Sequence, residues 1–109
     1  MYKGNRITVV IPCLNEEEGI PLVLKQIPNF VDEIVVVDNG STDRTAEIAS
    51  SFGAKVIEES IRGYGRAYKT GLANARGDII ITLDGDHSYP VDAISYLIEA
   101  LLHSGVRFV

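Results

Sequence analysis

The chain has 109 residues, of which 46% are hydrophobic and 23% are charged, and its formal net charge is −5. This length suits one compact domain, and the apolar content excludes a disordered chain because enough surface can be buried to offset the entropy of ordering. The negative charge argues against a protein that binds nucleic-acid backbones, which needs a basic face. No apolar run comes near the roughly 20 residues of a membrane-spanning helix.

The small numbers of cysteine and histidine residues indicate a cellular compartment and argue against some kinds of site. Cys13 is the only cysteine, so it cannot form an internal disulfide, and we expect a chain in a reducing cytoplasm. One cysteine and two histidines do not make the usual zinc site. Because no histidine stands in a suggestive place beside it, Cys13 is interpreted as a small, partly buried residue rather than a nucleophile.

Two prolines divide the beginning of the chain. The β-branched run Arg6–Ile11 predicts a first strand, which we expect Pro12 to stop. Pro21 lacks an N–H and fits only the first turn of a helix, so that helix is expected to begin near residues 18 to 20. The polar residues between the strand and the helix then lie in a loop that is free to contact a ligand.

Strand and helix patterns alternate along the rest of the chain. Further strands are predicted at Glu33–Asp38, Lys55–Glu58 and Asp78–Asp84. Further helices are predicted at Thr45–Ser51, at Tyr64–Ala75, and from Pro90 to Ser104–Gly105, the last with Ile94, Leu97, Ile98, Leu101 and Leu102 as its buried face. The order predicts an α/β fold, a Rossmann-like parallel sheet with helices on both faces.

The helix expected at Tyr64–Ala75 carries an apolar stripe. Its members are Tyr64, Ala67, Tyr68, Gly71, Leu72 and Ala75. Their spacing at three and four residues predicts a buried face. The two tyrosines fit this face better than they fit an exposed stacking platform.

The end of the chain looks like the beginning of a fifth strand, at Val106–Val109. Domains seldom end in this way, so residues 1–109 are expected to form one domain at the N-terminal part of a longer protein; a frayed edge strand is the alternative. An apolar strand without its neighbour leaves an open sheet edge, so self-association is expected.

Polar residues follow three of the predicted strands. Ligands of open parallel sheets bind beyond the carboxyl ends of the strands. Residues Pro12–Glu17, Asp38–Ser41 and Asp84–Ser88 all lie at such ends. This placement indicates a binding site, because acidic residues there do not help the chain to fold.

Asp84-Gly85-Asp86 is the sharpest of these elements. Two carboxylates separated by a flexible glycine can reach one hard cation, and Mg²⁺ or Mn²⁺ is commonly held by carboxylates together with substrate phosphates. An ordinary Asp-Gly turn is the alternative. His87 stands beside this motif as either a ligand or a bystander.

Two further segments could contact a nucleotide. Asp38 can accept hydrogen bonds from a base or ribose, and it can also begin an Asx turn; the two roles are compatible. The stretch Arg62–Arg66 is not a dinucleotide fingerprint, because Tyr68 occupies the third glycine position. It could still lie near a diphosphate at a helix N-terminus, or be a flexible loop with solvated arginines.

Three segments together resemble the family 2 glycosyltransferases of the GT-A fold. They are Val9–Glu17, Val35–Asp43 and Gly77–Asp86. The stretches from Gly63 to Leu72 and from His87 to Pro90 resemble most the polyprenyl-phosphate branch, typified by dolichol-phosphate mannose synthase. The likeness covers nearly the whole chain, with Asn39 where the family commonly has Asp and Gly85 where it commonly has Ala.

The resemblance implies a role for each of several residues. It places Pro12, Leu14, Glu16, Asp38 and Asp84 at the nucleotide sugar, and Arg62 joins them as the basic residue expected near the diphosphate. It places Asp84, Asp86 and Ser88 at a divalent cation, Mg²⁺ or Mn²⁺. The family continues with an acceptor-binding half that carries a general base in many members, so no catalytic base is assigned here and the 109-residue chain alone is expected to be inactive.

The implied activity is metal-dependent transfer of a hexose, with inversion, from GDP-mannose or UDP-glucose to a polyprenyl phosphate. A polyprenyl phosphate is a phosphate monoester, and such groups have a second pKa of about 6. It is therefore already largely a dianion at neutral pH and needs little deprotonation. The parent protein would then work at the cytosolic face of a membrane. The alternatives are a nucleotide-sugar-binding module that is inactive alone, a family 2 transferase acting on a saccharide hydroxyl, and a phosphoryl or nucleotidyl transferase, which would need a Gly-rich basic loop after the first strand.

Overall fold

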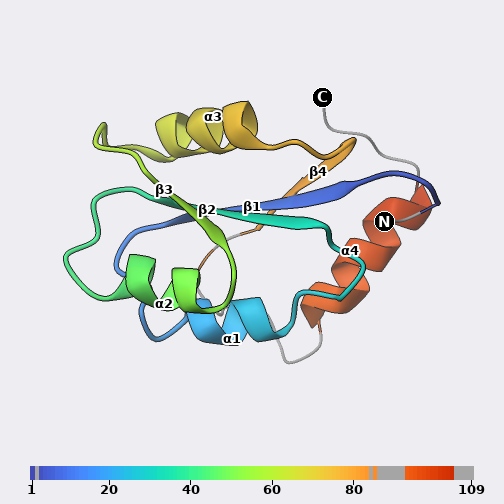
Figure 1. The fold of residues 1–109 in the computed structure, drawn as a ribbon, viewed down its shortest axis with the longest axis horizontal. Coiled ribbons are helices and arrows are strands. Elements are labelled where there is room, and N and C mark those ends of the chain that lie inside the picture. The colour runs from blue at the N-terminus through green and yellow to red at the C-terminus, as the bar shows by residue number, and fades with distance from the viewer. Residues whose placement is uncertain (2, 84, 86–92, 105–109) are drawn as a thin grey trace.

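The computed structural model describes residues 1, 3–83, 85 and 93–104. Its elements are β1 (Ile7–Cys13), α1 (Ile20–Lys25), β2 (Glu33–Asp38), α2 (Thr45–Ser51), β3 (Lys55–Glu58), α3 (Tyr64–Asn74), β4 (Ile79–Thr82) and α4 (Ala93–Ser104). The strands form a parallel sheet in the order β3-β2-β1-β4, with helices on both faces (Figure 1). This confirms the predicted Rossmann-like α/β fold, and the predicted bounds of β2, α2 and β3 and the predicted start of α1 are also confirmed.

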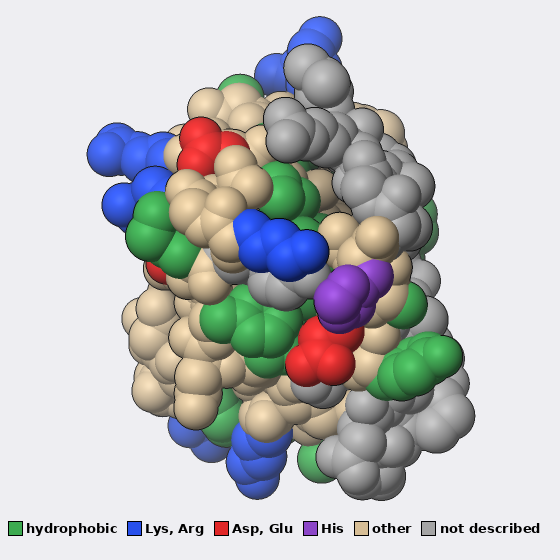
Figure 2. Space-filling model, turned by 90° about the vertical axis from the view of Figure 1, so that its right-hand side faces the viewer, with side chains coloured by type: hydrophobic (Ala, Val, Ile, Leu, Met, Phe, Trp, Pro, Cys, Tyr) green, Lys and Arg blue, Asp and Glu red, His purple; other side chains and the backbone are tan. Residues whose placement is uncertain are grey.

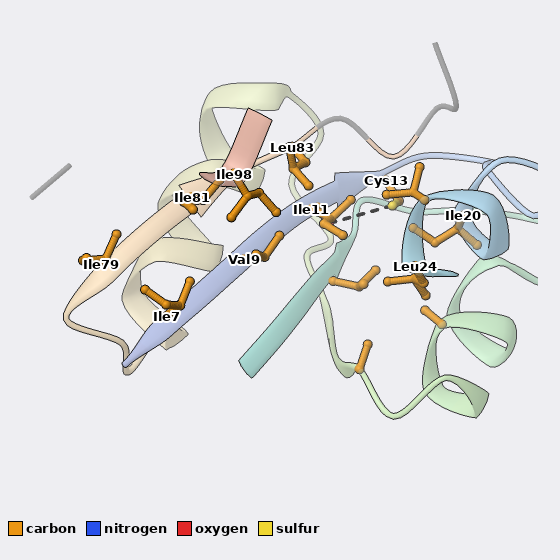
Figure 3. Close-up of a cluster of buried hydrophobic side chains, with 14 of the residues drawn as sticks. Ile7, Val9, Ile11, Cys13, Ile20, Leu24, Ile79, Ile81, Leu83 and Ile98 are labelled. Atoms are coloured by element: carbon orange, nitrogen blue, oxygen red, sulfur yellow. Dashed lines mark hydrogen bonds between the residues drawn. The ribbon is translucent and has the colours of Figure 1, made fainter. Parts of the chain in front are cut away.

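Two layers of apolar side chains hold the helices to the sheet. The larger cluster joins β1 and β4 to α1, α2 and α4, which lie on one face of the sheet (Figures 1 and 3). The smaller cluster, Val10, Val35, Val37 and Ala67, lies under α3 on the opposite face. β1 is buried along its whole length between these layers, so its carboxyl end is packed on both faces of the sheet.

The expectation that Pro12 stops the first strand is wrong. β1 continues to Cys13, which pairs with Asp38 of β2. On the other side of β1, the ladder to β4 ends at Val10 and Thr82, so Pro12 lies beyond it. A proline can stand at this place because no ladder hydrogen bond from its nitrogen is lost.

The apolar stripe of α3 is only partly buried. Ala67 and Gly71 face the sheet, whereas Leu72 is 41% exposed and Tyr64 is 70% exposed, so the prediction that Tyr64 lies in a buried face is wrong. The ring of Tyr64 stacks instead on Tyr68, with the ring centroids 6.3 Å apart. The helix approaches the sheet on its two small residues, so its buried face is narrow and large side chains at its edges stay in solvent.

Two glycines of α3 provide a matched test of this close approach. A Cβ on Gly71 would overlap Cγ1 of Val10 and lie 3.1 Å from Cγ2 of Val37, whereas a Cβ on Gly65 meets nothing within 4 Å. Gly71→Ala is therefore expected to lower the free energy of unfolding by about 1–3 kcal/mol through overpacking. Gly65→Ala is expected to raise it by about 0.5–1 kcal/mol, because alanine is the better helix former. Urea unfolding of both variants checks the pair, and equal effects would contradict this packing.

The final helix agrees with the prediction where it can be compared. Ile98 and Leu102 are buried. Three further predictions lie outside the described residues. They are the start of the helix at Pro90, the strand at Val106–Val109, and the burial of the side chains of Ile94, Leu97 and Leu101.

Figure 2 shows the face of the molecule where the strands begin. On the described part of this face, charged side chains of both signs are interspersed with hydrophobic ones. No helix among the described residues is long and apolar enough to span a membrane.

Candidate nucleotide-sugar site

A pocket of about 120 Å³ opens at the carboxyl end of β1. Its lining residues are Pro12, Cys13, Leu14, Asn39, Arg62, Gly63, Tyr64 and Ala67. Three predicted nucleotide-sugar residues thus meet in one pocket: Pro12 at the end of β1, Leu14 just after it, and Arg62 about 50 residues further along the chain. The parallel order of the sheet brings them together, because the loops after β1, β2 and β3 all leave the same edge.

A second, more open pocket of about 410 Å³ lies beyond the end of β2, and Asp38 lines it. Its other lining residues are Gly40, Ser41, Glu58, Glu59 and Ser60. The two pockets adjoin at Gly40, where an added Cβ would lie 3.3 Å from Nε of Arg62. The Arg62 guanidinium therefore lies over the boundary between them, and it forms no ion pair with any described residue.

Asp38 begins a turn at the end of β2. Its Oδ1 accepts a hydrogen bond from the Ser41 N–H at 3.1 Å. The donor lies three residues on, one further than in the predicted Asx turn, so the side chain closes the Asn39-Gly40 bend in a wider loop. The residue is buried, with 6% of its surface exposed, yet it still lines the second pocket. A carboxylate has lone pairs beyond the one that the turn uses, so Asp38 retains acceptor capacity toward a ligand.

Polar bridges fasten the loop after β1 to the loop after β2. Asn15, in the left-handed region at φ 54°, donates from its N–H to Oγ of Ser41 and accepts at Oδ1 from the Thr42 N–H. The Glu16 N–H donates to Oγ1 of Thr45 at 2.8 Å. The structure thus places Glu16 at the junction of the two loops and not among the residues that line either pocket.

Asn39 holds a third loop, Glu59–Gly63, in place. The analysis of the sequence did not indicate this role. Its Nδ2 donates to the carbonyl oxygens of Glu59 at 3.0 Å and Ile61 at 2.9 Å, and its Oδ1 accepts from the Gly63 N–H at 3.0 Å. Only 7% of the surface of Asn39 is exposed, and these three bonds satisfy both polar groups of its buried side chain. The backbone around Arg62 is held to the end of β2 in this way.

Glu59 stabilises the same loop from the other side. Its carboxylate accepts hydrogen bonds from Oγ1 of Thr70, from the Ile61 N–H at 3.0 Å and from Nε of Arg66 at 3.2 Å. The Thr70 hydroxyl and the Ile61 N–H are the main reasons why the pKa of Glu59 is lowered from its usual value. The loop from Glu59 to Gly63 is therefore anchored at both ends.

Tyr64 is a pocket residue that the analysis of the sequence missed. It lines the first pocket and its ring is largely exposed. The periodicity of α3 favoured burial, but Tyr64 is the first residue of the helix and lies next to the Arg62–Gly63 loop. That position at the carboxyl end of the sheet is the signal that could have found it.

Gly85 lies against the end of β1. A Cβ on Gly85 would lie 2.5 Å from Sγ of Cys13 and 3.3 Å from the carbonyl oxygen of Pro12. The middle residue of the predicted metal motif thus lies beside a wall of the first pocket. Asp84, Asp86, His87 and Ser88 themselves lie outside the described residues.

The chemistry of this motif fits a divalent cation. Carboxylate and hydroxyl oxygens are the ligands that Mg²⁺ and Mn²⁺ prefer, and the backbone at Gly85 lies next to Pro12 and Cys13, which line the first pocket. Within the described residues there is no group of three or more His, Cys, Asp or Glu side chains that could hold a metal.

Cys13 is a packing residue at this position. It is 3% exposed, its Sγ lies 3.8 Å from the Ile11 carbonyl oxygen (Figure 3), and burial raises the pKa of its thiol to about 12, with Glu16 and Asp38 adding to the shift. The thiol therefore stays protonated at neutral pH. Cys13 is thus more fully buried than the partly buried place expected for it, and a buried, protonated thiol is a poor nucleophile.

The chain belongs to glycosyl transferase family 2, whose family model matches residues 8–109. An uncharacterized glycosyltransferase of Mycobacterium tuberculosis is 43% identical over 98 residues, which cover 90% of this chain and 44% of that protein. A dolichyl-phosphate hexose transferase of Haloferax volcanii is 36% identical over 111 residues, covering 99% of this chain and 48% of that protein.

Solved structures of the same fold include glucosyl-3-phosphoglycerate synthase of M. tuberculosis in complex with Mn²⁺, UDP and glucosyl-3-phosphoglycerate. It superposes with a TM-score of 0.75 at 34% identity over 91% of this chain and 40% of the synthase. The chain spans less than half the length of these three proteins. The resemblance to family 2 glycosyltransferases of the GT-A fold is thus confirmed.

Proposed function

We propose that residues 1–109 form a single nucleotide-diphospho-sugar-binding domain, the donor half of a hexosyltransferase. The observation that carries this proposal is the pocket at the carboxyl end of β1, where Pro12, Leu14 and Arg62 meet, adjoining the pocket that Asp38 lines. Pro12 and Leu14 give the first pocket an apolar side, Arg62 gives it a cation, and Asp38 supplies a carboxylate in the adjoining pocket. In this arrangement a base fits the apolar side and the carboxylate, and a diphosphate fits the cation.

Each residue has a distinct role in the proposed site. Asp38 accepts hydrogen bonds from the base or ribose, and Pro12 and Leu14 form the apolar wall beside it. Arg62 donates charge-assisted hydrogen bonds to the diphosphate. Glu16 lies at the loop junction, outside the residues that line the first pocket, and is proposed to contact the nucleotide from there.

Asp84, Asp86 and Ser88 are proposed to hold Mn²⁺ or Mg²⁺. Such a cation supplies neutralisation of the negative charge that develops on the leaving diphosphate. The Mn²⁺ named in the structure of glucosyl-3-phosphoglycerate synthase supports a divalent cation without deciding between the two metals.

The proposed reaction is inverting transfer of the hexose to a polyprenyl phosphate. The acceptor oxygen forms a bond to C1 of the sugar as the bond from C1 to the diphosphate breaks, and the electron pair leaves with the nucleoside diphosphate. Because a phosphate monoester is already largely ionised at neutral pH, no base of this chain is required. The dolichyl-phosphate hexose transferase among the relatives supports this acceptor class.

The test is a transfer assay with the parent protein and, in parallel, the 109-residue chain. GDP-mannose or UDP-glucose labelled in the sugar is offered with Mn²⁺ and one of three acceptors: a short polyprenyl phosphate, 3-phosphoglycerate or a free saccharide. We expect label in the polyprenyl phosphate, formed by the parent protein and not by the 109-residue chain. Label in phosphoglycerate or saccharide alone would exclude the lipid acceptor, and transfer by the chain alone would contradict its role as a donor half.

A further inference from the structure

Asn39 is the residue whose contacts the family resemblance does not explain. The family commonly has Asp at this position, and Asp has no N–H to donate. Here two carbonyl oxygens, those of Glu59 and Ile61, and one N–H, that of Gly63, surround the side chain. Only a primary amide matches two acceptors and one donor at once.

The three bonds fix the backbone on both sides of Arg62. The Ile61 carbonyl lies immediately before Arg62 and the Gly63 N–H immediately after it. Gly63 has a φ of +126°, a conformation that glycine adopts without strain, so the chain turns sharply there into α3. The side chain of Arg62 then lies over Gly40, one residue past Asn39.

We infer that Asn39 is a positioning residue that acts through Arg62, holding the guanidinium over the pocket so that it meets the diphosphate. This inference rests on the proposed function. The binding energy of a cation on a flexible side chain depends on how much freedom it loses on binding, so a backbone clamped on both sides makes Arg62 a better phosphate ligand. Asn39→Asp, although it makes the motif more typical of the family, places a carboxylate against two carbonyl oxygens and releases the clamp.

The test is a double-mutant cycle read by calorimetric titration. The proteins are the unmodified chain, Asn39→Asp, Arg62→Ala and the double variant, each titrated with GDP and UDP and with the matching nucleosides, guanosine and uridine. With Arg62 present, Asn39→Asp is expected to weaken binding of the preferred diphosphate by about tenfold or more. With Arg62→Ala, the same change is expected to alter affinity by less than about twofold.

Nucleoside binding separates positioning from general damage. If Asn39 acts only through Arg62, affinity for the nucleoside stays unchanged in Asn39→Asp, because no phosphate is present for the guanidinium to contact. Equal losses in both arginine backgrounds, or an equal loss for nucleoside and diphosphate, would overturn the inference. An unmodified chain that binds neither diphosphate would refute the proposed donor site itself and the inference with it, so the two failures are distinguishable.

A second measurement covers the case in which Asn39→Asp does not fold. The Gly63 N–H is bonded to Asn39, whereas the Gly65 N–H lies in the first turn of α3, where amides lack intrahelical partners. Hydrogen exchange in the unmodified chain is therefore expected to be slower at Gly63 than at Gly65. Equal or faster exchange at Gly63 would show that the clamp is not formed.

Discussion

Gly85→Ala is expected to destabilise the chain by about 1–3 kcal/mol, through overpacking at the end of β1. The added Cβ would lie 2.5 Å from Sγ of Cys13 and 3.3 Å from the Pro12 carbonyl oxygen, and Cys13 is buried with little room to rotate. The displaced backbone carries the proposed metal ligands on both sides of Gly85. Mn²⁺-dependent nucleotide affinity is therefore expected to fall by about 10- to 100-fold, the range seen when residues that orient metal ligands are changed.

Cys13→Ala provides the matched rescue for this variant. Removing the sulfur frees the space into which the new methyl group points. The double variant Cys13→Ala/Gly85→Ala is therefore expected to regain most of the stability and the Mn²⁺-dependent affinity, in a cycle measured by urea unfolding and calorimetry. Additive losses in the double variant would contradict the contact between the two residues.

Arg62→Ala is expected to weaken nucleoside-diphosphate binding by about 10- to 100-fold, the value of one charge-assisted hydrogen-bonded contact of roughly 1.5–3 kcal/mol. The guanidinium lines the pocket and forms no ion pair with the described residues, so no internal partner compensates for its loss. Arg62→Lys is expected to recover only part of the affinity, because an ammonium group cannot make a bidentate contact. Calorimetric titration with GDP and UDP at low salt measures both effects.

Arg44→Ala is the control for this prediction. Arg44 is exposed and pairs with Glu47 on α2, at 3.1 Å from its Nε, and it lines neither pocket. Its removal changes the net charge by the same amount and is expected to leave nucleotide affinity within about twofold, since exposed charges away from the site are screened. Equal losses in the two variants would show that Arg62 acts through general charge rather than through a contact.

The fold could be predicted from the sequence because its strands and helices carry strong local signals. The buried runs of β1 and β2 and the proline at the start of α1 define those elements without knowledge of their neighbours. Pro12 was misassigned because its effect depends on where β4 ends, which is a property of the assembled sheet. Tyr64 was misassigned because periodicity shows which residues share a face but not how wide a face the sheet covers.

The site was predictable in its members more than in its organisation. The ends of the strands identified Pro12, Leu14 and Asp38, and the basic, Gly-rich stretch before α3 identified Arg62. The structure brings these residues to two adjoining pockets. The part played by Asn39 was hidden, because Asn-Gly is an ordinary turn signal and its partners lie 20 to 24 residues further along the chain. The contacts of Asn39 depend on the register of β2 with β3, which brings the Glu59 loop to the end of β2.

The measurement that tests the central claim most directly is calorimetric titration of the chain with GDP-mannose and UDP-glucose, with and without Mn²⁺. It is repeated on Asp86→Ala and on Glu18→Ala, a control that removes an exposed carboxylate. The proposed donor site predicts that one of the two nucleotide sugars binds, that Mn²⁺ strengthens the binding, and that only Asp86→Ala loses this metal dependence. A folded chain that binds neither nucleotide sugar, or binds one equally well without Mn²⁺ and in Asp86→Ala, would contradict a metal-dependent donor site in these residues.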